Sequence, residues 1–263
     1  MILKVLGSVS PYCKDDKNCP GYLVSTSTEK ILLDCGNGIV RNLILPDEIK
    51  NLTIIISHLH RDHYADLFGI AYASYVFHNL NILSNRIKVY IPKPSTSEEI
   101  HDYNLLTNLG EEQYLEIIPY TSTQTINLNN TNITFSSNPH NITSYSIKIS
   151  EHNQSIVYSG DTGYLGNTLE TFAKGTNLLI CESTFLKGQT RKKDYHLYAH
   201  EAAYIAKKAN VDKLLLTHFW PEIDREEYLK ESSPIFPNTE VAIENKVLKL
   251  PPNHQKWYTY PRW

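Results

Sequence analysis

The sequence predicts an α/β protein in which two sheets pack face to face with helices outside. Short β-rich apolar runs recur along the chain, and helical candidates are spaced through both halves. No linker, fixed-period repeat or low-complexity segment divides the 263 residues. We therefore expect one domain over residues 1–263.

The apolar runs share one feature: a chemically useful residue follows each of them. The segments are "KILLDCGNG", "TIIISHLH", "ITFSSNPH", "SIVYSGDTG", "NLLICEST" and "KLLLTHF". In the same order, the residues that follow the apolar runs are Asp34, His58 with His60, His140, Asp161, Glu182 and His218. Side chains at strand ends are held by a rigid scaffold. The pattern therefore predicts that one rim of the sheet assembly carries the functional site.

Helical patterns cover three further segments, residues 65–77, 97–110 and 199–210. Gly110 is expected to end the second helix as a C-terminal cap, and Asn210 to close the Ala-rich third. Residues 113–160 alternate like successive antiparallel strands, with turns in "INLNNTNITF" and at "EHNQ".

Composition excludes several classes of protein. A net charge of −3 and a pI near 6.4 argue against a protein that is basic overall and binds nucleic acid. The opening "MILKVLGSVS" lacks the apolar core of a signal peptide, and no apolar run approaches the roughly 20 residues that span a bilayer. We expect a soluble cytoplasmic protein without membrane association.

Four cysteines occur in the chain, and without a secretion signal free thiols are expected. Cys35 and Cys181 each end an apolar run and should be buried. Cys13 and Cys19 have the character of unpaired loop cysteines. The alternative is half of a structural zinc site, although no second Cys/His pair completes it.

The stretch "SHLHRDH" at residues 57–63 is dense in metal-competent side chains. His58 and His60 are two apart on an extended chain, so their rings point to one side. Asp62 and His63 come where the chain should turn into a helix. This arrangement can give one metal two imidazoles and a second metal a carboxylate and an imidazole, ligands that suit zinc. A solvated polar loop is the alternative interpretation.

"HLHRDH" matches the H-x-H-x-D-H signature of the metallo-β-lactamase superfamily, and the resemblance extends over nearly the whole chain. Asp34, His140, Asp161 and His218 match the other motifs of that superfamily in order. The resemblance implies a four-layer αββα sandwich of two mixed sheets, formed by a single metallo-β-lactamase-like domain. It also implies a dinuclear metal site at one edge.

The resemblance also implies a role for each matching residue. His58, His60 and His140 would hold a first zinc ion. Asp62, His63 and His218 would hold a second, and Asp161 would bridge the two. Asp34 would orient a ligand without binding metal. Two Zn²⁺ ions, with Mn²⁺ or Fe²⁺ as alternatives, can lower the pKa of a bound water towards roughly 7 and stabilise developing charge.

Other features indicate which branch of the superfamily the chain resembles. The diiron oxidoreductases usually carry glutamate where this chain has His60, and secreted antibiotic-degrading lactamases usually lack the carboxylate that Asp161 supplies. "NLLICESTF" and "DYHLYAHEAAYIAKKANVDKLLLTHFWP" resemble the late part of ribonuclease Z and its phosphodiesterase relatives. That likeness implies Asp62, Glu182 and His196 as catalytic residues.

Within that group the matching glutamate and histidine form a pair, here Glu182 and His196. The carboxylate would fix the imidazole tautomer and favour its protonated form, which can protonate a leaving alkoxide. The alternative is that Glu182 caps a strand end and His196 is an ordinary loop histidine.

Ribonuclease Z carries a protruding arm that grips tRNA, and in the common bacterial form it lies between the segments that match His140 and Asp161. Here only twenty residues separate these positions, so the arm is missing. We expect a phosphodiesterase acting on a small or cyclic phosphodiester, with RNA as a further candidate. Hydrolysis of a carboxylic ester, thioester or lactone on the same metals is the first alternative, and a non-catalytic nucleic-acid-binding module is the second. Oligomeric state stays open, although homodimers are common in these relatives.

Two basic or aromatic segments remain. Lys187, Arg191, Lys192 and Lys193 precede His196 and are interpreted as a flexible charged loop, with phosphate binding as the alternative. The tail "HQKWYTYPRW" has the composition of a packed strand or an interface, or of a surface that stacks a nucleobase.

Overall fold

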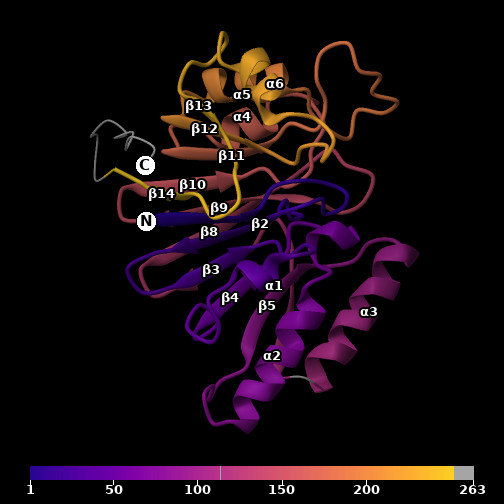
Figure 1. Ribbon diagram of the computed structural model, residues 1–263, viewed down its shortest axis with the longest axis vertical. Helices are drawn as coiled ribbons and strands as arrows, with labels where there is room; N and C mark the ends of the chain where they lie inside the picture. The colour runs from indigo at the N-terminus through magenta and orange to yellow at the C-terminus, as the bar shows by residue number, and fades with distance from the viewer. Residues whose placement is uncertain (113, 252–263) are drawn as a thin grey trace.

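The chain forms two seven-stranded sheets, and in each the antiparallel strands come first along the sequence and the parallel strands follow. One strand near the C-terminal end is the exception, because it returns to the first sheet and pairs antiparallel with the first strand of the chain. The computed structural model describes residues 1–112 and 114–251. The aromatic tail named above falls outside these residues. The two sheets lie face to face with helices on both outer sides, as the sequence predicted (Figure 1).

The first sheet runs in the order β14 (Val247–Lys249), β1 (Ile2–Gly7), β2 (Gly21–Ser25), β3 (Lys30–Leu33), β4 (Leu52–Ile55), β5 (Ile87–Pro92) and β6 (Leu115–Tyr120). The second runs in the order β13 (Thr239–Val241), β12 (Lys213–Thr217), β11 (Leu178–Glu182), β10 (Gln154–Tyr158), β9 (Tyr145–Glu151), β8 (Thr131–Ser137) and β7 (Thr125–Leu128). The helices are α1 (Ile39–Asn42), the 3-10 turn η1 (Arg61–His63), α2 (Leu67–Asn79), α3 (Ser97–Glu112), α4 (Thr168–Phe172), α5 (Ala199–Ala209) and α6 (Arg225–Ser232).

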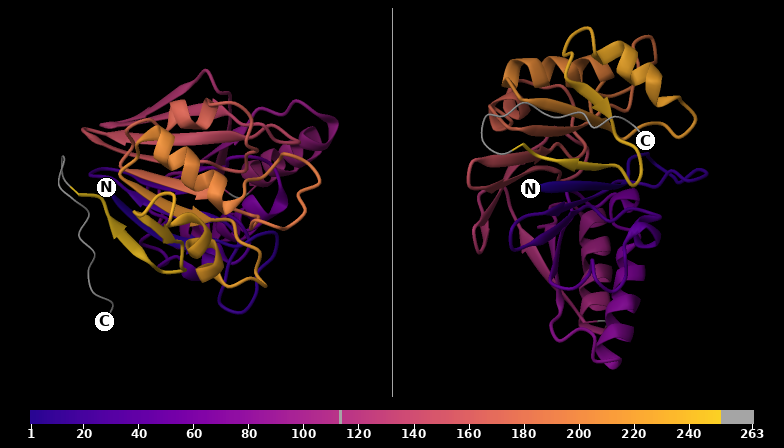
Figure 2. Two further views of the ribbon diagram at one scale, coloured as in Figure 1. Left: turned by 90° about the horizontal axis from the view of Figure 1, so that it is seen from above. Right: turned by 60° about the vertical axis from the view of Figure 1, so that its left-hand side comes forward.

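The alternation of side chains along the strands separates two apolar cores. Leu3, Val5 and Val24 point from the first sheet into the core shared with the second sheet. Leu23 and Leu32 point the other way, beneath the helices of the first half. Figures 1 and 2 show α2 and α3 at one end of the molecule and α4, α5 and α6 at the other, each set covering one sheet. The strands whose ends are expected to carry the functional site therefore belong to sheets that are covered on both faces.

Helix boundaries follow the sequence prediction closely at two helices. α2 occupies Leu67–Asn79, and α5 is closed by Asn210 in the left-handed conformation (φ 50°), as predicted. The predicted cap at Gly110 is wrong, because α3 continues to Glu112. A Cβ at Gly110 would lie 2.6 Å from Cγ1 of Ile117, so this glycine provides space for the neighbouring strand.

The strands of residues 113–160 are antiparallel from β7 onward, whereas β6 pairs in parallel with β5. β9 and β10 form a hairpin that turns at His152 and Asn153, so no arm extends from this segment. Within the described ranges 1–112 and 114–251, no helix combines the length and the apolar character needed to cross a bilayer.

Candidate metal centre

Strand direction explains why distant motifs meet at one edge. β3 and β4 are parallel, and β10, β11 and β12 are parallel, so the carboxyl ends within each set lie together. β8 is separated from β10 by one antiparallel strand and therefore ends on the same side. The structure brings together His58, His60, His140 and Asp161, then Asp62, His63 and His218, and finally Asp161, His196 and His218, in three overlapping groups whose ligand atoms lie within 4.8 Å of one another.

Three imidazoles converge in the first group. Nδ1 of His60 lies 3.0 Å from Nε2 of His58 and 3.3 Å from Nε2 of His140. Burial lowers the pKa of all three rings, that of His140 to about 4. Neutral rings direct lone pairs at a shared point, as zinc ligands do.

The second group joins a carboxylate to two imidazoles. Nε2 of His63 lies 3.3 Å from Nε2 of His218, and Oδ2 of Asp62 lies 3.6 Å and 3.9 Å from these two nitrogens. The hydroxyl of Ser10 donates to the same Asp62 oxygen (2.8 Å) and holds it in place. Sequence reasoning missed Ser10, because an isolated serine in a loop carries no recognisable signal.

Asp161 lies between the two groups. Its Oδ2 is 3.5 Å from Nε2 of His58, and its Oδ1 is 3.4 Å and 3.1 Å from Nε2 of His63 and His218. Oδ1 is buried without a partner in hydrogen-bond geometry. A buried carboxylate oxygen that faces imidazole nitrogens fits a cation between them. The donor set therefore fits divalent metal ions.

A second buried carboxylate, Asp34, orients ligands from the first sheet. Asp34 directly follows β3 with a positive φ of 57°, and its side chain is fully buried. Its oxygens accept hydrogen bonds from the Ser57 amide (2.6 Å) and hydroxyl (2.8 Å), from Nδ1 of His63 (2.7 Å) and from the Tyr158 hydroxyl (2.7 Å). Nε2 of His63 is thereby left as the nitrogen that faces the site.

The same carboxylate reaches His58 through Ser57. The Ser57 hydroxyl donates its hydrogen bond to Asp34, so Nδ1 of His58 must be the donor in the 3.0 Å contact with the Ser57 oxygen. This arrangement fixes Nε2 of His58 as the free lone pair. One buried acid thus sets the tautomer of one histidine in each group.

Glu182, on the second sheet, also orients histidines through hydrogen bonds. It accepts from Nδ1 of His196 (2.9 Å), the Thr162 amide (3.0 Å), the Leu197 amide (3.1 Å) and the Thr184 hydroxyl (2.8 Å). The Thr184 oxygen in turn accepts from Nδ1 of His218 (2.8 Å). Nε2 of His218 is therefore the nitrogen that faces the site.

His196, which belongs to the third group, lies beside a histidine of each of the first two groups. Its ring stacks on His218 with centroids 5.4 Å apart, and it meets the His140 ring edge-on at 5.2 Å. Burial favours the neutral ring, but the Glu182 carboxylate outweighs it and raises the pKa of His196 to about 9. The structure thus forms the Glu–His pair expected from the sequence and places it beside the metal-competent cluster.

The loop before α5 is anchored by Arg191. Nη1 donates to the His196 carbonyl (2.8 Å) and to Glu201 (2.6 Å), and Nη2 contacts Asp194 (2.8 Å). The carbonyl of Tyr195 in this loop accepts from Nδ1 of His140 (3.0 Å). One loop therefore positions both His196 and a histidine of the first group.

The basic segment thus divides into two kinds of residue. Arg191 is largely buried and internally paired, which the sequence interpretation did not foresee. Lys192 and Lys193 are exposed, in line with the predicted charged loop.

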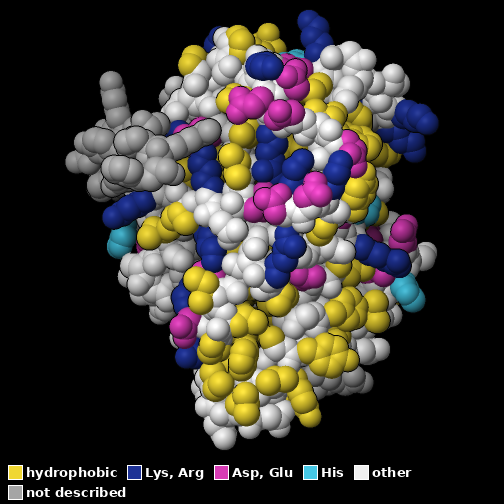
Figure 3. Space-filling view, in the orientation of Figure 1, with side chains coloured by type: hydrophobic (Ala, Val, Ile, Leu, Met, Phe, Trp, Pro, Cys, Tyr) yellow, Lys and Arg dark blue, Asp and Glu magenta, His cyan; other side chains and the backbone are white. Residues whose placement is uncertain are grey.

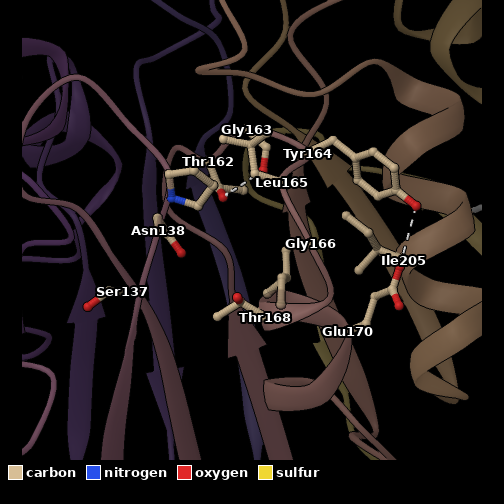
Figure 4. Close-up of a pocket in the computed structure, with 12 residues that line it drawn as sticks. Ser137, Asn138, Thr162, Gly163, Tyr164, Leu165, Gly166, Thr168, Glu170 and Ile205 are labelled. Atoms are coloured by element: carbon tan, nitrogen blue, oxygen red, sulfur yellow. Dashed lines mark hydrogen bonds between the residues drawn. The ribbon is translucent and has the colours of Figure 1, made fainter.

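A small hollow is lined by Thr162, Gly163 and Tyr164, which follow Asp161 in the sequence (Figure 4). It is lined by residues of β8, α4 and α5, and a hydrogen bond from Tyr164 to Glu170 runs along one side. Its volume of about 10 Å³ is room for about one water molecule, so it is not a substrate pocket.

Comparison with known proteins agrees with this geometry. The family model described as the β-lactamase superfamily domain matches residues 29–219. The chain belongs to the β-lactamase superfamily. The probable metallo-hydrolase YhfI of Bacillus subtilis is 28% identical over 245 residues, which cover 92% of this chain and 96% of YhfI. Ribonuclease Z of Archaeoglobus fulgidus is 22% identical over 307 residues, covering 94% of this chain and 95% of that protein.

Solved structures show the same superfamily fold. The crystal structure of YhfI superposes with a TM-score of 0.82 at 24% identity, covering 94% of this chain and 98% of that one. The short form of human tRNase Z gives a TM-score of 0.72 at 20% identity, covering 95% and 100%. The four-layer αββα sandwich predicted from the sequence is confirmed.

Replacing Asp34 with Asn should weaken zinc binding about 10–100-fold, because an amide cannot accept from all the donors that orient His63 and His58. Competition with a chromogenic chelator measures the affinity, and circular dichroism checks the fold. Asp47→Asn, at an exposed carboxylate, is the matched control. Unchanged affinity in Asp34→Asn would contradict the orienting role.

Arg191→Ala should release the loop that carries Tyr195 and His196. We expect zinc affinity to fall about tenfold, because His140 loses its fixed carbonyl acceptor. The neighbouring exposed Lys192→Ala is the control and should bind zinc like the wild type. Equal affinities for the two variants would show that Arg191 does not position the centre.

Proposed function

We propose that this protein is a dinuclear zinc phosphodiesterase related to ribonuclease Z. Membership of the superfamily and the cluster of histidines and aspartates make it a metal-dependent hydrolase. The finer statement, a phosphodiester substrate cleaved with help from Glu182 and His196, is supported by the position of these two residues. We further propose that residues 1–263 are one domain located in the cytoplasm.

The proposed metal ligands follow the two groups. His58, His60 and His140 would hold one zinc ion, Asp62, His63 and His218 the other, and Asp161 both. Zinc pairs at such sites supply an activated water and stabilise the charge that develops on a phosphoryl oxygen. Mn²⁺ or Fe²⁺ suits the same oxygen and nitrogen donors.

The position of His196 carries the proposal. Its Nδ1 is held by Glu182, which leaves Nε2 as the ring nitrogen available to a substrate, and the ring lies against His140 and His218, one histidine from each of the two proposed zinc sites. A protonated imidazole there can donate to a phosphoryl oxygen and then protonate the departing alkoxide. An alkoxide leaving group needs this proton, whereas a thiolate departs without it, so the position of His196 disfavours a thioester substrate. The likeness to ribonuclease Z favours a phosphodiester over a carboxylic ester or lactone, which also release an alkoxide. On both grounds together we prefer phosphodiesters to the ester, thioester or lactone alternative.

The proposed substrate is a small or cyclic phosphodiester, and RNA is the larger candidate. The β9–β10 hairpin turns at two residues, so this segment offers no extended surface for a folded RNA. The net charge of −3 also opposes extensive phosphate contacts. A non-catalytic nucleic-acid-binding module would have no use for a complete ligand set and a Glu–His pair.

We also propose a homodimer through the outer face of α2. This helix carries no Asp, Glu, Lys or Arg and buries Leu67 and Ile70 on its inner face. On the outer face Tyr72 and Val76 are 62% and 47% exposed, and Leu80, directly after the helix, is 61% exposed. Figure 3 shows apolar side chains gathered at this end of the molecule. An apolar, uncharged face can cover a second copy of itself without leaving buried charges unpaired.

Hydrolysis of bis(p-nitrophenyl) phosphate should be lost on chelation and return when zinc or manganese is added back, because the activated water depends on the metal. The same preparations are assayed in parallel on a thioester and a lactone. Activity on the latter substrates alone, with two metals bound, would contradict the phosphodiesterase proposal.

His196→Ala should keep both metals and lose about a hundredfold or more in rate on alkyl phosphodiesters. The loss on p-nitrophenyl phosphodiesters should be much smaller, because p-nitrophenolate leaves without a proton. His200→Ala is the matched control, since His200 also pairs with a glutamate, Glu231 (2.7 Å), but belongs to neither metal group. An equal loss on both substrate types would argue against proton donation.

The alkaline limb of the pH–rate profile should report His196. The protonated ring is the active form, and Glu182 raises its pKa, so the rate should fall as pH rises through that pKa. Glu182→Gln removes this effect and should move the limb to lower pH. In a His196→Ala background this limb should be absent; a limb that persists there and still shifts with Glu182→Gln would assign it to another group.

A further inference from the structure

Two of the four thiols lie against each other near the metal centre. Sγ of Cys13 is 4.0 Å from Sγ of Cys19. Cys13 is exposed and Cys19 is fully buried, and both are free thiols. Cys35 and Cys181 are also free but fully buried. Neither Cys13 nor Cys19 belongs to a group of three metal-competent side chains in residues 1–112 and 114–251, which disfavours the zinc-site alternative.

Cys19 has little room to move. Its amide donates to the Asn37 carbonyl (3.0 Å), and a Cβ placed on Gly36 would lie 2.7 Å from its Cβ and 2.0 Å from the Asp62 carbonyl. Gly36 is therefore packed directly between Cys19 and the backbone of Asp62. Any closer approach of the two sulfurs must come from Cys13.

Cys13 is free to make that approach. It lies at the surface, where its thiol donates to the Asn37 carbonyl (3.0 Å), and the backbones of Lys14 and Lys17 pair to form the tight turn that follows it. A disulfide needs sulfurs about 2.05 Å apart, so the gap to close is about 2 Å. Rotation of the Cys13 side chain with a small shift of its backbone covers this distance.

We propose that Cys13 and Cys19 form a reversible disulfide, with a small disulfide as the oxidant, and that its formation weakens metal binding at the group containing Asp62. The sequence interpretation, two unpaired loop cysteines, describes the reduced state. The disulfide does not depend on the proposed function, whereas its effect on metal binding rests on the zinc site proposed at Asp62.

The exchange proceeds in two balanced steps. The Cys13 thiolate attacks one sulfur of the small disulfide, whose S–S bond breaks and releases one thiolate. Cys19 then gives up its proton to solvent and attacks the Cys13 sulfur, which releases the second thiolate. Two protein thiols are oxidised to one disulfide while the oxidant is reduced to two thiols. Burial raises the pKa of Cys19, in keeping with Cys13 as the first nucleophile.

The link to the metal centre runs through Ser10. Closure draws the segment before Cys13 toward Cys19, and Ser10 lies on that segment. Its hydroxyl holds Oδ2 of Asp62 at 2.8 Å, and its amide donates to the Phe219 carbonyl next to His218. A shift of Ser10 removes a hydrogen bond that positions a proposed zinc ligand, which we expect to lower affinity about tenfold.

The thiols are tested on the zinc-loaded protein incubated with oxidised glutathione, followed by alkylation under denaturing conditions and peptide mass mapping. We expect Cys13 and Cys19 to become linked without a retained glutathione, Cys35 and Cys181 to stay reduced, and a phosphine reductant to reverse the change. Cys13→Ser, at an exposed position, should form no internal disulfide. A lasting glutathione adduct on Cys13, or no loss of thiols, would overturn the proposal.

Zinc affinity before and after oxidation tests the coupling. Competition with a chromogenic chelator should show one of the two zinc sites weakened about tenfold in the oxidised wild type and unchanged in oxidant-treated Cys13→Ser. Ser10→Ala should show the weakened site without any oxidation. A disulfide that forms with no change in zinc affinity would overturn the link to Asp62.

Discussion

The site depends first on the buried carboxylate of Asp34. A fully buried charge is costly unless donors satisfy it, and here Ser57, His63 and Tyr158 do so. Ser57 and His63 follow β4 of the first sheet, whereas Tyr158 ends β10 of the second. The hydrogen bonds that stabilise the charge therefore also join the two sheets at the edge where the ligands meet, so fold and site share one constraint.

Glu182 completes this arrangement from the opposite sheet. Through Thr184 it fixes His218, and directly it fixes His196, so each sheet contributes one buried acid that orients histidines toward the common edge. Ligands held in this way need no rearrangement to bind a cation, which favours high affinity and a precise position for the proton donor. The loop anchored by Arg191 orients His140 in a similar way, because its Tyr195 carbonyl accepts from Nδ1 of that histidine.

Much of the fold and of the metal centre was predictable, because the signals that indicate them are local in the sequence. A residue that directly follows a β-rich run must lie at a strand end, which is enough to predict the edge and most of its ligands. The remaining features depend on contacts between distant segments. No pattern indicates that Tyr158 reaches Asp34, that the Tyr195 carbonyl meets His140, or that Gly110 makes space for Ile117. The positive φ of His218, 62°, likewise has no signal in the sequence.

The central claim is that two acids, one from each sheet, arrange a site for two metal ions. Anomalous diffraction from crystals of the zinc-loaded protein, recorded on both sides of the zinc absorption edge, tests it most directly. The account predicts two zinc peaks, one among His58, His60 and His140 and one among Asp62, His63 and His218, with Asp161 contacting both. A single peak, or zinc bound away from these residues, would contradict it.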